Sequence, residues 1–170
     1  MGNNKNISQY YYRNEDGIVV YKIESCKWLQ DGNLKKSFRC YIKDKKGEWV
    51  NDFKSIEPVL YMLPSVIKSI KNNETIIYVE DEKSADALKN IGFTATTTFG
   101  GLKSFNKFSK NYAQQIKRGN LIIFPNNSNH SKQYSKTVYN SFKSCCKSIG
   151  IINLPDLKEN MSIAEWINNG

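Results

Sequence analysis

A buried strand is predicted by the run Thr75-Ile76-Ile77-Tyr78-Val79, in which every residue is β-branched or aromatic. Good helix formers follow over residues 81–90, among them Ala85 and Leu88. A strand without polar alternation that leads into a helix is typical of a parallel sheet covered on both faces.

The same alternation of short apolar runs and longer amphipathic segments continues to the end of the chain. After the helix at 81–90 we expect, in order, a strand at 93–98, a helix at 107–118, a strand at 121–124, a helix at 131–148, a strand at 151–154 and a helix at 162–168. This order predicts an α/β fold in which helices flank a parallel sheet.

The residues before this region have a different pattern. Tyr-, Ile- and Val-rich runs are separated by turn residues, which predicts two antiparallel hairpins, with strands at 7–13, 18–24, 37–43 and 48–50. Pro58 and Pro64 mark the change of pattern. We therefore expect an antiparallel β region over residues 1–56 and an α/β domain over residues 57–170.

The chain has 170 residues, enough for one compact domain or slightly more without disulfides or metals to hold its core. No apolar run approaches the 18 or so residues of a membrane span, and the N-terminus does not resemble a signal peptide. The four cysteines include no C-x-x-C pair, and the adjacent Cys145 and Cys146 are more typical of helix packing than of redox chemistry. We expect a cytoplasmic protein with reduced thiols and no membrane partner.

The charge is unevenly distributed. The chain has 25 Lys and Arg against 16 Asp and Glu, and no carboxylate side chain occurs between Asp86 and Asp156. That acid-free stretch holds ten basic residues, enough to account for the net charge of +9: Lys89, Lys103, Lys107, Lys110, Lys117, Arg118, Lys132, Lys136, Lys143 and Lys147. Such a surface attracts phosphate backbones and acidic proteins alike, although a solvated basic surface also keeps a protein soluble.

A second basic zone lies in the N-terminal region. Its cations are Lys35, Lys36, Arg39, Lys43, Lys45 and Lys46, and they alternate with Phe38, Tyr41 and Trp49. On strand faces these side chains suit stacking on bases and contact with phosphates. An amphipathic hairpin with its aromatic residues in a small core has the same pattern.

Three stretches lie where strands of an open α/β sheet end, the place where such sheets bind ligands. They are residues 79–88, Val-Glu-Asp-Glu-Lys-Ser-Ala-Asp-Ala-Leu, residues 95–101, Ala-Thr-Thr-Thr-Phe-Gly-Gly, and residues 122–128, Ile-Ile-Phe-Pro-Asn-Asn-Ser. Together they resemble the Toprim domain of phage and plasmid DNA primases. The hairpins and residues 59–64 resemble the segment before Toprim in the primase-helicases, so the resemblance covers most of the chain.

The resemblance implies a Mg²⁺ site for phosphoryl transfer or strand cleavage, formed by a glutamate after the first parallel strand and a D-x-D pair after the third. Glu80 matches the glutamate. Asn126 and Ser128 occupy the D-x-D positions, and Ser162 stands where the family often has a further acid. Neutral oxygens replace carboxylates poorly, so the departure implies a degenerate site, with Glu80 kept either for a residual site role or as a helix N-terminal acid. The zinc module of primases is absent from this sequence.

Other polar features have simpler interpretations. His130, the single histidine, lies in a turn-rich segment without a carboxylate or cysteine neighbour, which suggests a surface residue. Gly100 and Gly101 suit either a phosphate-binding backbone or an ordinary turn.

We therefore expect a non-catalytic Toprim-like protein of a phage or other mobile element that binds DNA, RNA or a nucleoprotein complex. One version is an inhibitor of host nucleic-acid immunity, of the anti-CRISPR type. Two alternatives stay open: a divergent primase or nuclease that uses Mg²⁺, and a module that binds an acidic protein. Otherwise we expect no metal or cofactor, and the oligomeric state is open. The residues expected to contact phosphate or an acidic partner are Lys103, Lys107, Lys110, Lys132, Lys136, Lys35, Lys36 and Arg39.

Overall fold

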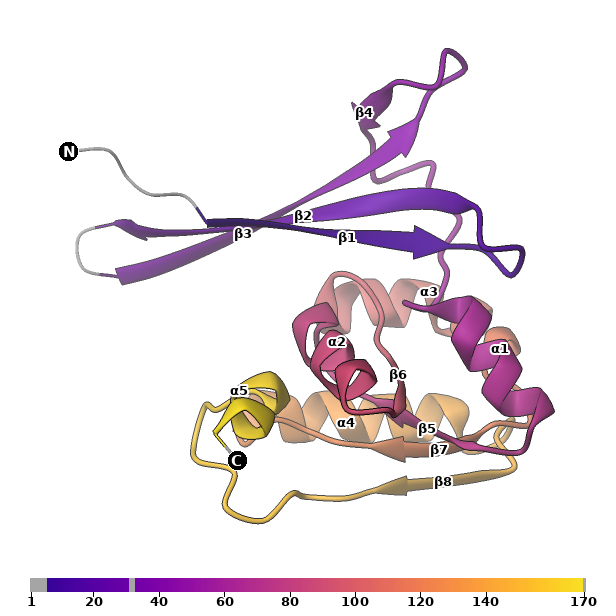
Figure 1. Cartoon of the computed structure of the whole chain (residues 1–170), viewed down its shortest axis with the longest axis vertical. Helices are drawn as coiled ribbons and strands as arrows, with labels where there is room; N and C mark the ends of the chain where they lie inside the picture. The colour runs from indigo at the N-terminus through magenta and orange to yellow at the C-terminus, as the bar shows by residue number, and fades with distance from the viewer. Residues whose placement is uncertain (1–5, 31–32, 170) are drawn as a thin grey trace. The chain divides into compact units, whose positions relative to one another are not determined.

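The computed structural model describes residues 6–30 and 33–169, and the chain divides into two compact units, Met1–Glu57 and Pro58–Gly170. Each unit contains its own four-stranded sheet (Figure 1). The sheet of the first unit is antiparallel and that of the second is parallel.

The first unit is a meander of four strands in sequence order: β1 (Asn6–Arg13), β2 (Val19–Gln30), β3 (Asn33–Lys43) and β4 (Trp49–Asn51). Two of its turns are built in the same way. The side-chain oxygens of Asn14 and Asp44 accept hydrogen bonds from the backbone N–H groups of the residues four positions later, both at 2.9 Å. Gly17 and Gly47 in these turns have positive φ angles of 81° and 85°, which glycine adopts without strain.

The second unit contains β5 (Thr75–Tyr78), β6 (Thr94–Thr96), β7 (Asn120–Ile123) and β8 (Ser148–Ile151), all parallel and ordered β6-β5-β7-β8. The chain moves outward from β5 to β6, and from β7 to β8 in the opposite direction. The strand order therefore reverses between β5 and β7, the position where open α/β sheets bind ligands.

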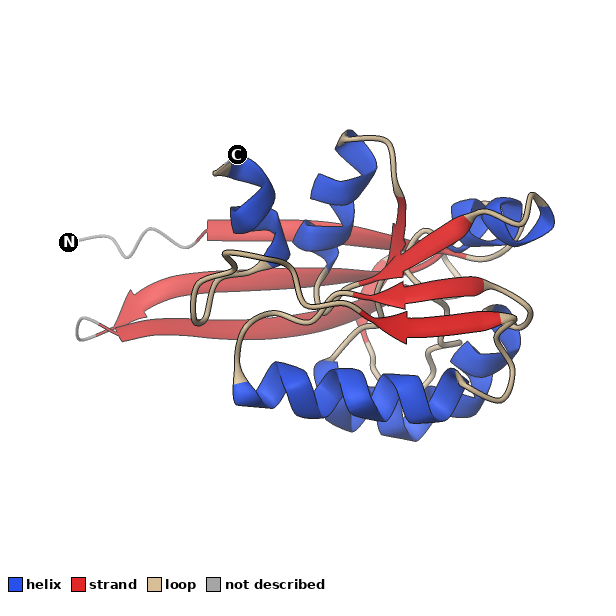
Figure 2. Ribbon diagram, turned by 90° about the horizontal axis from the view of Figure 1, so that it is seen from below, coloured by secondary structure: helices blue, strands red, loops and turns tan. Residues whose placement is uncertain are grey.

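In the described part of the second unit, five helices accompany this sheet: α1 (Leu63–Lys71), α2 (Glu82–Asn90), α3 (Gly101–Gln115), α4 (Asn129–Phe142) and α5 (Ile163–Asn168). Contacts join α2 to α5 and α3 to α4. Figure 2 shows helices on both faces of the sheet. The predicted fold class, a parallel sheet flanked by helices after an antiparallel β region, is confirmed.

Several predicted boundaries were wrong, including those of β2, which extends to Gln30 instead of 24, and β3, which begins at Asn33 instead of 37. Helix α1 was not predicted because Pro64 suggested a break, yet a proline in the first turn of a helix has a suitable φ and lacks only an N–H that would be unpaired there. Helix α3 begins six residues earlier than expected because Gly100 is its N-cap residue. Strand β8 begins three residues earlier, and α4 ends at Phe142, so Cys145 and Cys146 follow the helix instead of lying within it.

An aromatic cluster forms the core between α3, α4 and the sheet. Phe105 of α3 lies at its centre, fully buried, with ring centroids 5.5 Å from Phe142, 5.8 Å from Tyr134 and 6.0 Å from Tyr112. Tyr78 of β5 closes the cluster at 6.2 Å from Phe142. Burial of rings of this size is a main source of stability in a domain of about 110 residues.

Three buried hydroxyl groups form a closed triangle at the end of β5. The Tyr78 hydroxyl lies 2.7 Å from that of Tyr134 and 2.9 Å from that of Thr98, and the last two are 3.0 Å apart. Burial raises the pKa of Tyr134 to about 12 and that of Tyr78 well above its usual value. Both phenols therefore stay protonated, and the triangle is a neutral, satisfied network next to the carboxylates that follow β5.

Asp86 of α2 gives a pH-dependent contribution to stability. Burial raises the pKa of its carboxyl group, although Tyr61 donates a hydrogen bond to it at 3.0 Å. The folded-state pKa then lies above the unfolded one, so ionised Asp86 destabilises the fold as pH rises through the folded value. We expect Asp86→Asn, which can still accept from Tyr61, to raise the melting temperature at pH 7 and not below pH 4. Thermal unfolding of both proteins over pH 3–8 measures this, and a lower melting temperature at pH 7 would contradict it.

Candidate functional site

The loops that follow β5 and β7 meet at the carboxyl-terminal end of the parallel sheet. Glu80 follows β5, and the segment 125–128 follows β7, its neighbour in the sheet. Glu80 Oε1 accepts a hydrogen bond of 3.0 Å from the backbone N–H of Asn126. The structure therefore brings Glu80 next to Asn126, the residue at the first of the two D-x-D positions. Their hydrogen bond links the two loops.

Asn126 continues this link to the last helix. Its Oδ1 accepts a hydrogen bond of 3.1 Å from the backbone N–H of Ile163, the first residue of α5. Beside it, Asn127 Nδ2 donates to the carbonyl oxygen of Leu157 at 2.7 Å, and the backbone N–H of Asn160 donates to the carbonyl oxygen of Asn127 at 3.0 Å. These bonds hold the segment between β8 and α5 against the loop after β7.

Ser128 and Ser162 are both helix caps. Ser128 is the N-cap residue of α4, and its Oγ accepts from the backbone N–H of Ser131 at 3.1 Å. Ser162 is the N-cap residue of α5 and forms a capping box with Glu165. Hydroxyl groups at these positions stabilise the helix starts, a role that the sequence analysis did not assign to them.

The acids next to Glu80 also serve the helix start. Asp81 is the N-cap residue of α2: its Oδ1 accepts from the backbone N–H of Ser84 at 2.9 Å, and its Oδ2 accepts from the Ser84 hydroxyl at 3.0 Å. The Ser84 Oγ in turn accepts from the backbone N–H of Ala164 at 3.2 Å. Glu80 lies one residue before this cap and is not itself the helix N-terminal acid.

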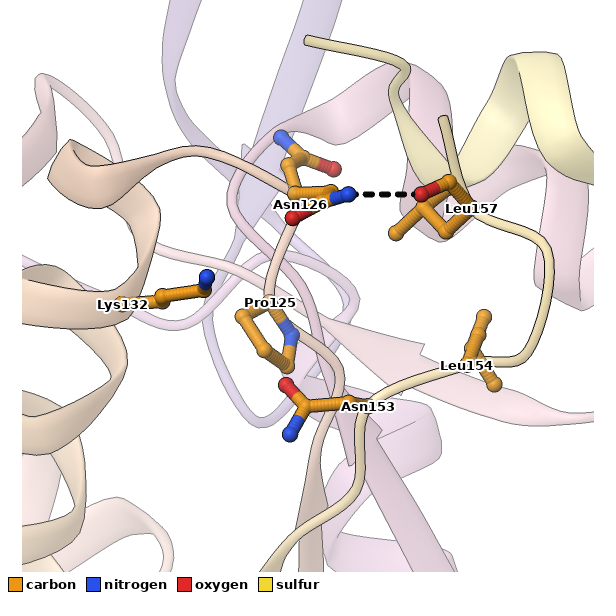
Figure 3. Close-up of a pocket in the computed structure, with 7 residues that line it drawn as sticks. Pro125, Asn126, Lys132, Asn153, Leu154 and Leu157 are labelled. Atoms are coloured by element: carbon orange, nitrogen blue, oxygen red, sulfur yellow. Dashed lines mark hydrogen bonds between the residues drawn. The ribbon is translucent and has the colours of Figure 1, made fainter. Parts of the chain in front are cut away.

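A cavity of about 200 Å³ lies beyond the ends of β7 and β8 (Figure 3). Its lining combines apolar groups, amides and one ammonium group, from Pro125, Asn126, Asn127, Lys132, Asn153, Leu154 and Leu157. None of these side chains is acidic, and the cavity is smaller than the roughly 300 Å³ at which drug-sized ligands are usually bound. Of the basic residues predicted to contact phosphate or an acidic partner, Lys132 lines this cavity.

The predicted lysines of α3 and α4 are exposed. On α3, Lys103, Lys107 and Lys110 are spaced at i, i+4 and i+7, on the side opposite the buried Phe105 and Tyr112. Lys103 lies in the first turn of the helix, near the loop after β6, whereas Lys110 lies about 14 Å from Gly101 along the helix axis. The α3 lysines are therefore spread along the exposed side of the helix, instead of all lying next to the loops of the site.

The other residues singled out from the sequence lie on α4 and in the first unit. Lys136 is exposed one turn after Lys132 on α4, and His130 is exposed in the first turn of the same helix. Arg39 is exposed on β3 of the first unit, while the side chains of Lys35 and Lys36 lie outside the described residues.

Gly100 and Gly101 are explained by backbone geometry. Gly100 has a φ of 80°, and a Cβ atom added to it would lie 2.7 Å from Ser104 Cβ. The glycine therefore allows α3 to start close to the preceding loop, as the turn interpretation required.

Comparison with known proteins shows similarity in structure. No protein-family model and no curated protein sequence matches the chain. A DNA primase domain from Pseudomonas aeruginosa aligns with a TM-score of 0.64 at 13% identity, over 96% of this chain and 47% of that chain. The chain has the fold of DnaG-type, Toprim-containing primase domains.

Two further structures with this primase fold align similarly. The RNA polymerase domain of Mycobacterium tuberculosis primase DnaG, in complex with double-stranded DNA, has a TM-score of 0.56 at 14% identity, over 94% of this chain and 48% of that one. A DnaG primase catalytic domain bound to single-stranded DNA has a TM-score of 0.54 at 12% identity, over 96% and 48%. The chain therefore spans about half the length of the primase chains it matches.

The residues at the Toprim metal position do not fit a Mg²⁺ ion. Glu80 is the one carboxylate among the three matched positions, and it already accepts from Asn126. The Asn126 Oδ1 and Ser128 Oγ oxygens are neutral and accept from backbone N–H groups. Hard divalent cations prefer several carboxylate oxygens. Over residues 6–30 and 33–169, no three His, Cys, Asp or Glu side chains are grouped in a way that suits a metal ion.

The helices do not have the character of membrane spans. None of those in the described part of the chain combines the length and the apolar composition that crossing a bilayer requires.

Proposed function

We propose that this chain is a non-catalytic, Toprim-like domain that binds nucleic acid, alone or within a nucleic-acid-handling complex. The observation that carries the proposal is the acid-free stretch between Asp86 and Asp156, whose predicted contact lysines on α3 and α4 are exposed. A surface with this charge favours phosphate backbones at any sequence.

Two further facts support the proposal. The matched primase structures include one in complex with double-stranded DNA and one bound to single-stranded DNA, so the fold is compatible with both forms. In this chain the oxygens at the Toprim metal position are engaged in hydrogen bonds with backbone N–H groups, which favours a structural role over catalysis.

The first test is binding of fluorescent single-stranded DNA, duplex DNA and RNA over a salt series, with Mg²⁺ or EDTA. We expect binding that weakens steeply with salt and does not depend on Mg²⁺, because lysines and not a metal contact the phosphates. Mg²⁺- or Mn²⁺-dependent cleavage or primer synthesis that Glu80→Gln abolishes would instead support the divergent-enzyme alternative.

A matched double variant, Asn126→Asp with Ser128→Asp, tests the metal position directly. Asp at 126 can still accept from Ile163, and Asp is a good N-cap at 128, so we expect the variant to fold. Three carboxylates should then bind Mg²⁺, seen as a rise in melting temperature with Mg²⁺ that wild type lacks. An equal rise in wild type would contradict a degenerate site.

The narrower role is inhibition of host nucleic-acid immunity, of the anti-CRISPR type, by a protein of a phage or other mobile element. A basic α/β body of this kind would obstruct the DNA path of a nucleoprotein or hold its guide or target strand. Failure to bind any guide or effector complex in pull-downs would exclude this version. Binding to an acidic protein without affinity for nucleic acid would favour the protein-binding alternative.

A further inference from the structure

One face of the antiparallel sheet gathers aromatic and cationic side chains from all four strands. The register pairs Tyr11 of β1 with Lys22 of β2, and Lys22 with Tyr41 of β3. Lys43, two residues after Tyr41 and so on the same face, is paired with Trp49 of β4. We refer to Tyr11, Lys22, Arg39, Tyr41, Lys43 and Trp49 as the aromatic face.

The rings of the aromatic face converge around Lys22. The Lys22 ammonium lies 5.1 Å from the Tyr41 ring centroid and 5.2 Å from that of Trp49. The Tyr11 ring meets Trp49 edge-on at 6.4 Å between centroids. These contacts, together with the 3.3 Å ion pair between Lys22 and Glu24, hold the rings in defined positions before any ligand arrives.

The outer part of this face is accessible and carries positive charge. Tyr11 is 42% exposed, Trp49 is half-buried, and Lys43 and Arg39 are exposed. Among the described side chains of this face the acid is Glu24, whose Oε1 accepts from Gln9 at 2.7 Å as well as from Lys22. Lys22 offsets that charge, which leaves Lys43 and Arg39 as the excess.

Rigid rings beside exposed cations match the chemistry of unpaired nucleotides. Every base offers a π-face for stacking, and each nucleotide adds a phosphate for a cation. In duplex DNA the base faces are covered by neighbouring bases, and an acidic protein has carboxylates but few flat rings. The Lys43 ammonium lies 5.5 Å from the centroid of the Trp49 ring. A base that stacks on Trp49 would replace this cation–π contact. The displaced ammonium group would then be close to the phosphate of the stacked nucleotide.

We propose that the aromatic face binds two or three consecutive unpaired nucleotides, with bases stacked on Tyr11 and Trp49 and phosphates paired with Lys43 and Arg39. The ring centroids of Tyr11 and Trp49 are 6.4 Å apart, and four-stranded sheets with aromatic residues stack two or three bases. The inference rests on the proposed function, since it assumes a nucleic-acid ligand. It adds a preference for single strands that the lysines of α3 and α4 do not provide.

The test compares wild type with Tyr11→Leu and Trp49→Leu, which keep apolar bulk but lose the rings. The probes are a 12-nucleotide poly(dT) strand and a 12-base-pair duplex, measured by anisotropy over a salt series. We expect each variant to bind the single strand about 5- to 150-fold more weakly, the range for loss of one stacked base. Duplex affinity should stay within twofold of wild type, because these rings do not meet paired bases.

Tyr11→Phe and Trp49→Phe are the matched controls, because they keep a ring and should bind poly(dT) within about threefold of wild type. If Leu and Phe variants lose equal affinity, or if the Leu variants lose none, the inference is wrong while the proposed function stands. If wild type binds neither probe, the proposed function fails and this inference with it. Competition by polyglutamate as effective as that by poly(dT), at equal charge, would show an acidic-protein surface and overturn the inference.

Discussion

Reversal of five lysine charges on α3 and α4 is expected to abolish most nucleic-acid binding. The variant carries Glu at positions 103, 107, 110, 132 and 136, all exposed. If each lysine neutralises one phosphate, the slope of log affinity against log salt falls by about 4 to 5 for duplex DNA, at roughly 0.9 per contact. Affinity at physiological salt should then fall by at least about 100-fold, as anisotropy titrations with the duplex would show.

The control is a second variant with the same change in net charge at exposed lysines outside these helices: Lys54, Lys68, Lys71, Lys83 and Lys89. It should keep most of the salt slope, because the proposed contacts remain. Equal losses in both variants would show that overall charge, and not the α3 and α4 surface, drives binding. An unchanged slope in the first variant would place the contacts elsewhere, for example on the aromatic face.

Like-charge repulsion within α3 and α4 should not complicate the result for the first variant. Lys103 and Lys107, and likewise Lys132 and Lys136, are like-charge pairs at i and i+4. Glutamate at all these positions restores like-charge pairs of the opposite sign, so the repulsion along each helix is similar. Far-ultraviolet circular dichroism and a melting curve would verify that both variants remain folded.

The parallel sheet was predictable because its strands are short and apolar and are separated by helical patterns. Strand β5 is the clearest case, because it is paired with a strand on each side, β6 and β7, and because each of its residues favours strands. Helix α1 was not predicted because Pro64 has two meanings, a break inside a helix or a favourable start, and only the position of the first turn distinguishes them.

The position of the candidate site could be predicted from the sequence, but the hydrogen bonds that join its residues could not. Glu80 and Asn126 are 46 residues apart, and Asn126 and Ile163 are 37 apart, so no local pattern reveals that they are bonded. The caps were different. Ser162 and Glu165 have the spacing of a capping box, a local signal that identifies Ser162 as a helix start instead of a replaced acid.

Phe105→Ala is expected to be the most destabilising single substitution in the second unit. The ring is fully buried and contacts Tyr112, Tyr134 and Phe142 with centroid distances of 5.5–6.0 Å. Its removal loses the transfer free energy of the ring and leaves a cavity between α3, α4 and the sheet, which together cost about 3–5 kcal/mol. The free energy of unfolding of a domain is only about 5–15 kcal/mol, so the variant should be close to unfolding at 37 °C.

Urea unfolding followed by Trp166 fluorescence measures this in the second unit, with Trp28 and Trp49 of the first unit changed to Phe. Phe93→Ala is the control, because Phe93 is 53% exposed and its loss should change the unfolding free energy by less than about 1 kcal/mol. Equal effects of the two substitutions would contradict a core centred on Phe105.

Because α3 and α4 carry the proposed contact lysines, Phe105→Ala should also weaken duplex binding near its unfolding midpoint, but not at low temperature, where the two helices stay packed. This temperature dependence separates loss of the folded surface from loss of a contact, since charge reversal of the lysines weakens binding at every temperature.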